Sequence, residues 1–131
     1  MTATLAFVTP PAGLAPLTRF TLNEVSGADG LYSLCAVDNG AIRLFVLDAA
    51  IYLPDYSPEI SNEQCLAIDL HTAEDAMVLV VANPGEAGTR INLLAPIIVN
   101  MHTGACAQVI LENQDWPLQA ELATRSVSSV R

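Results

Sequence analysis

The hydrophobic pattern of this chain is that of short β-strands. Apolar and polar residues alternate over Thr4–Val8 and Arg19–Val25, and this period of two is typical of strands with one buried face. Leu31–Val37 and Ile42–Leu47 are more continuously apolar. The Asn-Gly pair at positions 39–40 between them predicts a tight hairpin turn, because both residue types readily adopt left-handed backbone angles.

The second half of the chain predicts further strands and one short helix. Ser61 and Gln64 fit a capping box, which indicates a helix that ends at about Ile68. Ala76–Ala82 is an apolar run too short to favour a helix, so it is expected to be a strand. Residues 118–125 could form two loose helical turns.

The stretch Thr89–Leu111 predicts two buried strands joined by a turn, with a break in the first strand. Pro96 has no N–H for a ladder and favours an extended Ala95, so the strand should bend or change partner there. Asn92 and Gln108 lie among apolar residues. A buried amide without partners costs about 1–3 kcal/mol, so each should bond a backbone group of this chain or of a partner.

These segments together predict a mainly β fold, a small antiparallel β-barrel or sandwich of about seven strands with one short helix. We expect a single domain over residues 1–131, with its core at about 4–118 and a C-terminal tail at 119–131. The chain has 131 residues, 52% of them hydrophobic and 15% charged, which is enough to bury one core without disulfides.

Composition and charge exclude several functional classes. No apolar run approaches the roughly 18 residues of a membrane span, and the first basic residue is Arg19, so we expect a cytoplasmic protein with no membrane partner. The three cysteines lie far apart and fit small buried residues of a reducing compartment. A net charge of -9 disfavours direct binding to nucleic acid, and it is compatible with a basic partner protein.

Candidates for catalysis or metal binding are few. The sequence lacks a glycine-rich phosphate loop, a nucleophile elbow and a paired histidine motif. The alternative function is a small metal-dependent or hydrolytic β-barrel enzyme, for which the acid, base or ligand residues would be His71, His102 or the cluster Asp48, Asp55 and Glu59. Surface histidines and a solvated acidic loop explain the same residues without chemistry, and we expect no cofactor.

Two tyrosines indicate a surface for protein binding. Tyr52 and Tyr56 flank Pro54 in the loop that follows Ile42–Leu47. Amphipathic rings on a stiff loop contribute a large contact area at low entropic cost. The alternative is that both rings cover the end of the barrel.

The order of several short motifs resembles that of the flagellar assembly factor FliW family. These motifs are Pro11-Ala12-Gly13, Leu31-Tyr32-Ser33-Leu34, Phe45-Val46-Leu47-Asp48, Pro54-Asp55-Tyr56, Asn92-Leu93-Leu94-Ala95-Pro96-Ile97 and Gln108-Val109-Ile110-Leu111. The resemblance extends from about Leu5 to Leu118. The chain departs from the family pattern at Leu14, Ala49 and Arg90, where an aromatic residue, a proline and a threonine are common.

This resemblance implies a β-barrel protein without catalytic activity that acts by exchanging partners. FliW proteins bind flagellin and the carbon storage regulator CsrA, a basic dimer that represses flagellin translation, so that export of flagellin frees FliW to antagonise CsrA. We expect a monomer that binds these partners through two places. One is the loop Tyr52–Tyr56, called the tyrosine loop below, and the other is an exposed strand edge near Asn92–Pro96, where the proline would leave backbone groups free. The residues expected to contact a partner are Tyr52, Asp55, Tyr56, Asn92, Ala95 and Pro96.

Overall fold

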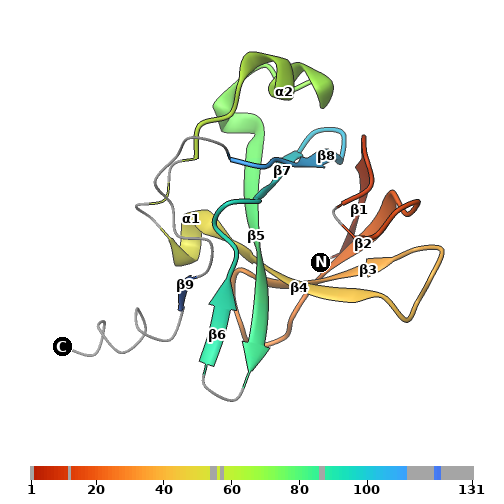
Figure 1. Cartoon of the computed structure of the whole chain (residues 1–131), viewed down its shortest axis with the longest axis vertical. Helices are drawn as coiled ribbons and strands as arrows, with labels where there is room; N and C mark the ends of the chain where they lie inside the picture. The colour runs from red at the N-terminus through yellow and green to blue at the C-terminus, as the bar shows by residue number, and fades with distance from the viewer. Residues whose placement is uncertain are drawn as a thin grey trace.

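The computed structural model describes residues 2–11, 13–53, 56, 58–85, 88–111 and 120–121. Most of its strands are arranged as a barrel, β6 and β9 lie beside it, and two short helices accompany the strands (Figure 1). The strands are β1 (Thr2–Phe7), β2 (Arg19–Glu24), β3 (Leu31–Ala36), β4 (Arg43–Asp48), β5 (Ala76–Gly85), β6 (Gly88–Ile91), β7 (Ile97–Asn100), β8 (Ala105–Gln108) and β9 (Ala120–Glu121). The helices are α1 (Ala49–Tyr52), α2 (Asn62–Ala67) and a 3-10 turn at Ala73–Asp75.

Seven strands form a closed ring. Their order is β4-β3-β2-β1-β8-β7-β5, and pairing of β5 with β4 closes the ring. The prediction of a mainly β barrel of about seven strands is confirmed. One pair is not antiparallel, because β1 and β8 run parallel. The hydrophobic period of a strand does not depend on the direction of its neighbour, so the sequence pattern gave no sign of this pair.

The predicted hairpin of β3 and β4 is confirmed, but its tight turn and the helical turns expected at residues 118–125 were wrong. The connection between β3 and β4 occupies residues 37–42, and Gly40 is not among the described residues with a positive φ. The Asn39 side chain accepts a hydrogen bond from the Ala41 N–H at 3.1 Å. This bond stabilises a turn within a connection that is longer than a two-residue hairpin loop. Ala120–Glu121 forms β9 against β6 where helical turns were expected.

The capping box of α2 is confirmed. The Ser61 hydroxyl accepts from the Gln64 N–H at 3.1 Å, and the Gln64 side chain accepts from the Ser61 N–H at 2.9 Å. Both bonds satisfy donors that a helix start leaves without intrahelical partners. No helix among the described residues is long and apolar enough to cross a membrane.

The predicted strand break at Pro96 is confirmed as a large bulge. β4 occupies one edge of β5, and both β7 and β6 pair with the other edge. On β5 only two residues separate the partners of Ile97 and Ile91, whereas five residues separate those two isoleucines. The segment 92–96 therefore bulges out of the ladder, which a proline permits because it donates no ladder bond.

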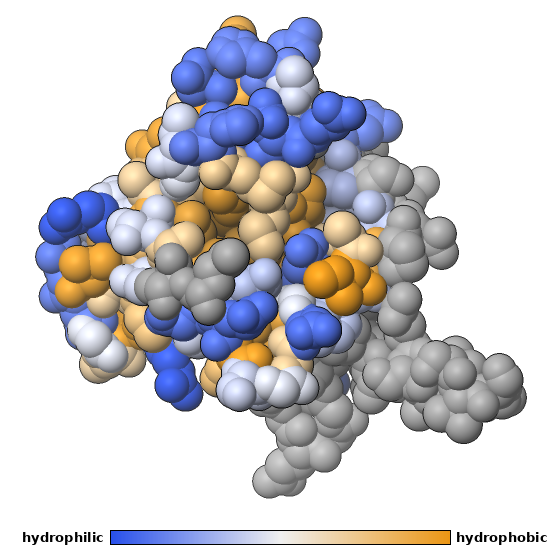
Figure 2. Space-filling model, turned by 180° about the vertical axis from the view of Figure 1, so that it is seen from behind, coloured by the Kyte–Doolittle hydropathy of each residue, from blue (hydrophilic) through white to orange (hydrophobic). Residues whose placement is uncertain are grey.

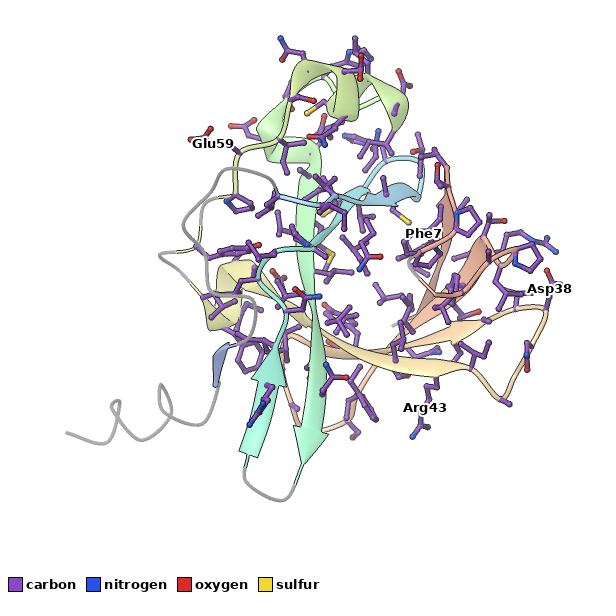
Figure 3. The ribbon with its side chains drawn as sticks, in the orientation of Figure 1. Phe7, Asp38, Arg43 and Glu59 are labelled. Carbon is purple, nitrogen blue, oxygen red and sulfur yellow. The ribbon has the colours of Figure 1, made fainter. Side chains whose placement is uncertain are left out.

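The barrel wall buries apolar side chains on both of its faces. Leu79 of β5 belongs to the inner core together with Phe20 and Leu34, all fully buried. Its neighbour Val80 belongs to a second cluster outside the ring. A third cluster, centred on Ile98, lies near α2. Burial on both faces explains why the sequence of these strands is continuously apolar, and Figure 3 shows side chains filling the space between the strands.

One buried polar side chain connects the end of α2 to the barrel. Asn100 at the end of β7 is 3% exposed. Its amide nitrogen donates to the carbonyls of Ile68 at 3.0 Å and Asp69 at 2.9 Å, and its oxygen accepts from the His102 N–H at 2.9 Å. Asp69 has a φ of 57°, which strains a residue other than glycine. The sequence analysis did not identify Asn100.

We predict that Asn100→Ala lowers the free energy of unfolding by about 2–4 kcal/mol, because two buried carbonyls and one N–H lose their partner. Asn62→Ala is the matched control, since Asn62 is exposed on α2. Urea unfolding followed by tryptophan fluorescence measures both variants. An Asn100→Ala midpoint equal to that of the control would show that the amide contributes no stability.

Candidate partner-binding surface

The loop that carries the predicted tyrosines begins with a capped helical turn. Asp48 at the end of β4 accepts a hydrogen bond from the Ala50 N–H at 3.0 Å and so starts α1. Gly30 faces this turn, and a Cβ there would lie 3.0 Å from the side chains of Ile51 and Tyr52. Gly30 also has a φ of 84°. A glycine is therefore needed for α1 to pack on the connection between β2 and β3.

Tyr56 fastens the loop to the bulge at 92–96. Its ring packs against both outer apolar clusters, and its hydroxyl donates to the Leu93 carbonyl. Burial raises the pKa of Tyr56 well above its ordinary value. Tyr52 packs against the cluster that contains Leu93 and is half-buried. Both rings therefore pack over the outer apolar clusters of the barrel wall.

The bulge does not present the free strand edge that the sequence analysis expected. Ala95 is 7% exposed and Pro96 is among the fully buried side chains. The Pro96 carbonyl accepts from the Val109 N–H at 2.9 Å, and the Gln108 side chain donates to the Ala95 carbonyl at 3.3 Å. Gln108 at the end of β8 and Val109 after it thus bond two carbonyls that lie outside the β5 ladder.

The amides of this region bond within the chain. The Asn92 side chain accepts from the Leu94 N–H at 3.1 Å, and the Asn92 N–H donates to the Val81 carbonyl at 3.0 Å. The Leu94 carbonyl accepts from the Leu111 N–H at 2.8 Å. The expectation that Asn92 and Gln108 bond nearby backbone groups is confirmed.

The structure thus brings most of the predicted contact residues into one region. Tyr52 and Tyr56 lie over the outer clusters, and Tyr56 reaches the bulge that contains Asn92, Ala95 and Pro96. Asp55 lies outside the described residues. A hollow of about 530 Å³ continues this region beneath α2, with Tyr56, Ile60, Cys65 and His71 in its lining.

The residues considered for catalysis form separate pairs. His71 lies 2.8 Å from Asp69 and His102 lies 2.8 Å from Asp75, and both histidines are exposed. Asp48 is engaged in the α1 cap and Glu59 is exposed. Among the described residues, no three or more His, Cys, Asp or Glu side chains are placed to hold a metal ion together.

The residues that sequence reasoning missed here are the backbone acceptors of the bulge. A backbone carbonyl cannot be recognised from the sequence, and the only indication was a run of apolar residues around Pro96. Ile51 was also missed, although its side chain is 51% exposed on α1. Exposed apolar residues beside the tyrosines widen the apolar area that a partner protein could cover.

Comparisons with known proteins agree with this fold. A family model described as FliW protein matches residues 2–122. The flagellar assembly factor FliW of Thermotoga neapolitana is 32% identical over 112 residues, which cover 82% of this chain and 74% of that protein. The FliW of Symbiobacterium thermophilum is 29% identical over 118 residues, with 86% of each chain covered. A crystal structure of the flagellar assembly factor FliW has a TM-score of 0.84 at 21% identity and covers 91% of this chain and 84% of its own.

We predict that Tyr56→Phe lowers the free energy of unfolding by about 1 kcal/mol, because the Leu93 carbonyl loses its donor while the ring stays in place. Tyr56→Ala should lower it by about 3 kcal/mol, since it also removes ring contacts with two clusters. Urea unfolding of both variants checks this. Equal stability of wild type and Tyr56→Ala would contradict the structural role of the ring.

Stability should also fall at alkaline pH. Burial raises the pKa of Cys106 to about 12 and also raises that of Tyr56. The unfolded chain releases these protons first, at pKa values of about 8.5 for Cys and about 10 for Tyr, so the stability present below those values decreases as the pH rises through them. Urea midpoints should decrease above about pH 9, and Tyr56→Phe should lose less than wild type above about pH 10. Parallel curves for the two proteins would argue against the Tyr56 contribution.

Proposed function

Because the chain belongs to the FliW family, we propose that it serves flagellar assembly by binding other proteins. The family is one of non-enzymatic assembly factors. The match over residues 2–122, which includes every strand described above, is the observation that carries the proposal. A barrel with its hydrogen-bonding groups satisfied inside and its helices and loops outside is suited to recognition by surface contacts.

The partners in this proposal are flagellin and the translational repressor CsrA, which would bind in mutually exclusive complexes in the cytoplasm. Flagellin would occupy the protein until export, and the freed protein would then bind CsrA and relieve repression of flagellin translation. The protein would act as a monomer. The net charge of -9 supports attraction to CsrA, which is basic in the FliW system.

The distribution of charge also supports a basic partner. Arg19 lies 3.5 Å from Asp38, and Arg43 lies 5.1 Å from the centre of the Phe45 ring, at the outer end of β3 and β4. Figure 3 shows Arg43 and Asp38 far from Glu59. Glu59, before the start of α2, is thus remote from these two arginines, so a cationic surface could approach this part of the loop without repulsion from them.

The contact surface in this proposal is α1 together with the loop between α1 and α2. Tyr52 and Asp55 would touch the partner directly, together with the exposed side chain of Ile51. Tyr56 would contact the partner with the part of its ring that stays exposed and would position the loop through its bond to Leu93. Asn92, Ala95 and Pro96 would support the loop from below, since Ala95 and Pro96 are buried.

Acidity would also contribute to antagonism of CsrA. An acidic protein docked beside an RNA-binding surface raises the electrostatic cost of bringing a phosphate backbone to that surface. Release of RNA would then depend on salt as well as on contact geometry.

The proposal is tested by co-purification from a flagellated host. Tagged protein should recover flagellin and CsrA, and added purified flagellin should displace CsrA from the complex. A ternary complex that holds both partners at once would refute the partner switch. Recovery of neither partner would refute the proposed function itself.

A charge test addresses the tyrosine loop. Asp55→Asn combined with Glu59→Gln should weaken CsrA binding by about tenfold at low salt and by less at high salt, because surface charges are screened. The control is Asp38→Asn combined with Glu74→Gln, which removes the same charge elsewhere. Equal effects of the two double variants would mean that net charge, and not this loop, governs binding.

A further inference from the structure

The barrel has one seam where pairing is incomplete. β2 pairs with β1 from Thr2 to Ala6, whereas β8 pairs with β1 only at Ala6 and Phe7. Within the described part of the chain, residues 2–5 of β1 therefore carry a ladder on one side alone. An unpaired strand edge is a template for another strand.

The backbone of Thr4 points into this seam. The Ala6 N–H donates to the Gly104 carbonyl at 2.9 Å, on the β8 side, and the Phe7 N–H donates to the Thr18 carbonyl at 2.8 Å, on the β2 side. Alternate residues of a strand direct their N–H groups to opposite edges. Thr4 thus presents its N–H to the same side as Ala6, and Thr4 is exposed.

Gly104 marks the point where the seam closes. A Cβ at Gly104 would lie 2.6 Å from the Thr4 carbonyl oxygen, so the two backbones meet there without room for a side chain. β8 begins at the next residue. The open part of the edge therefore lies toward Thr2 and has a defined end.

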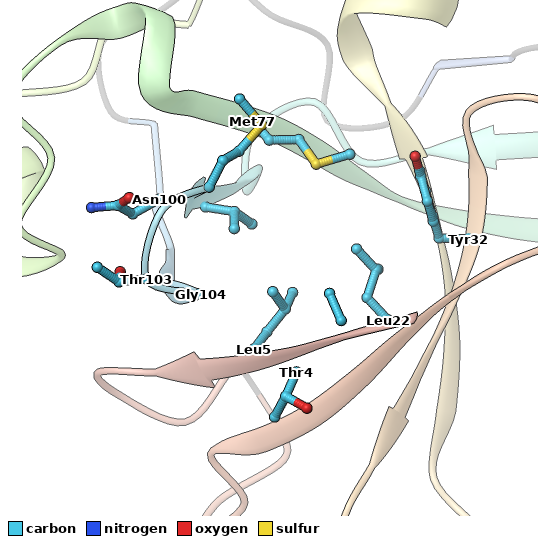
Figure 4. Close-up of a pocket in the computed structure, with 11 residues that line it drawn as sticks. Thr4, Leu5, Leu22, Tyr32, Met77, Asn100, Thr103 and Gly104 are labelled. Atoms are coloured by element: carbon cyan, nitrogen blue, oxygen red, sulfur yellow. The ribbon is translucent and has the colours of Figure 1, made fainter. Parts of the chain in front are cut away.

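An apolar hollow of about 350 Å³ adjoins the open edge (Figure 4). Leu5, Leu22, Met77, Val99 and Met101 contribute apolar atoms to its lining. Met101 is 57% exposed. Figure 2 shows the opposite side from Figure 1, with apolar atoms gathered in a hollow that hydrophilic atoms surround. Methionine side chains adapt to ligands of different shape, so this lining suits a varied apolar segment.

The charge beside the hollow is negative. Tyr32 lines the hollow, and Glu24 lies opposite Tyr32 in the ladder between β2 and β3. Burial together with the carboxylates of Asp48, Glu24 and Asp29 raises the pKa of Tyr32. Among the described residues that line the hollow, none is an arginine. A basic side chain on a bound segment would be attracted to these carboxylates.

We propose that this seam binds an extended segment of a partner protein, which adds a strand to residues 2–5 of β1. Its apolar side chains would enter the hollow, and its basic side chains would face Glu24 and Asp29. The inference rests on the proposed function, because it gives a protein that acts by binding a second docking place, distinct from the tyrosine loop. Main-chain bonds would supply affinity, and the hollow and the carboxylates would select the segment.

A basic segment fits better than a second copy of this chain. Each copy carries a net charge of -9, and pairing two β1 edges would bring the Glu24 and Asp29 carboxylates of both copies together. A small apolar molecule would fill the hollow without using the Thr4 N–H. The backbone edge and the charge therefore both favour a peptide.

The test uses the full chain labelled with 15N and an acetylated octapeptide of alternating lysine and valine. The amides of Thr4, Met101 and Gly104 should shift on titration, and exchange of the Thr4 amide with solvent should slow. The same peptide with glutamate in place of lysine should bind at least about tenfold more weakly. Shifts confined to the tyrosine loop, or none, would overturn the proposal.

Variants separate the backbone edge from the hollow. Thr4→Pro removes the N–H that points into the seam and should weaken binding about tenfold, whereas Thr4→Val keeps the N–H and should weaken it much less. Met101→Gln should weaken binding several-fold, with Leu66→Gln on α2 as control, since Leu66 is also exposed. If Thr4→Pro fails to fold, Met101→Gln and Asp29→Asn decide the question. Unchanged peptide affinity in both of these variants would reject the seam as a binding site. Self-association of the protein that shifts the same amides without peptide would also reject the proposal.

The outcomes for this seam and for the proposed function are separable. If flagellin and CsrA bind wild type while the peptide leaves the seam unchanged, the seam fails and the function stands. If the peptide binds the seam while neither protein is recovered from the host, the function fails and the seam stands.

Discussion

The structure depends on the pairing of β5 along both of its edges. On one side, Leu79–Ala82 pair with β4, which closes the ring. On the other side, Ala76–Leu79 pair with β7 and Ala82–Gly85 pair with β6. A closed ring leaves few free ladder groups, and β5 buries apolar side chains on both of its faces. Leu79 and Val80, neighbours in β5, accordingly belong to different clusters on the two sides of the wall.

β6 and β7 share one edge of β5, so the backbone groups between these two strands need hydrogen-bond partners outside the ladder. Side chains supply some of these partners. Between β6 and β7 the backbone leaves the ladder, and the hydroxyl of Tyr56 and the amide of Gln108 bond two of the carbonyls released there. The Asn100 amide likewise donates to two carbonyls that follow α2. Among the described residues no buried side-chain nitrogen or oxygen lacks a partner. The polar residues inside the apolar sequence thus form hydrogen bonds to backbone groups where the strands are interrupted.

The same interruptions shape the surfaces that other proteins can reach. The bulge supports the tyrosine loop from beneath, and the short pairing of β1 with β8 leaves the seam beside Thr4. The first surface offers aromatic and aliphatic side chains, and the second offers a strand edge with an apolar hollow. In the two proposals, a FliW-family protein with a net charge of -9 would engage partners by contacts of different kinds.

The sequence by itself determined the strands of the ring, the capping box at Ser61 and the break at Pro96, because hydrophobic period, helix caps and proline act over a few residues. The order of its motifs also indicated the family. Only the tertiary structure decided that β1 and β8 pair in parallel, that the bulge is buried, and that Tyr56 bonds Leu93. These features join segments tens of residues apart. Their partners are set by ring closure and burial, and neither leaves a local pattern in the chain.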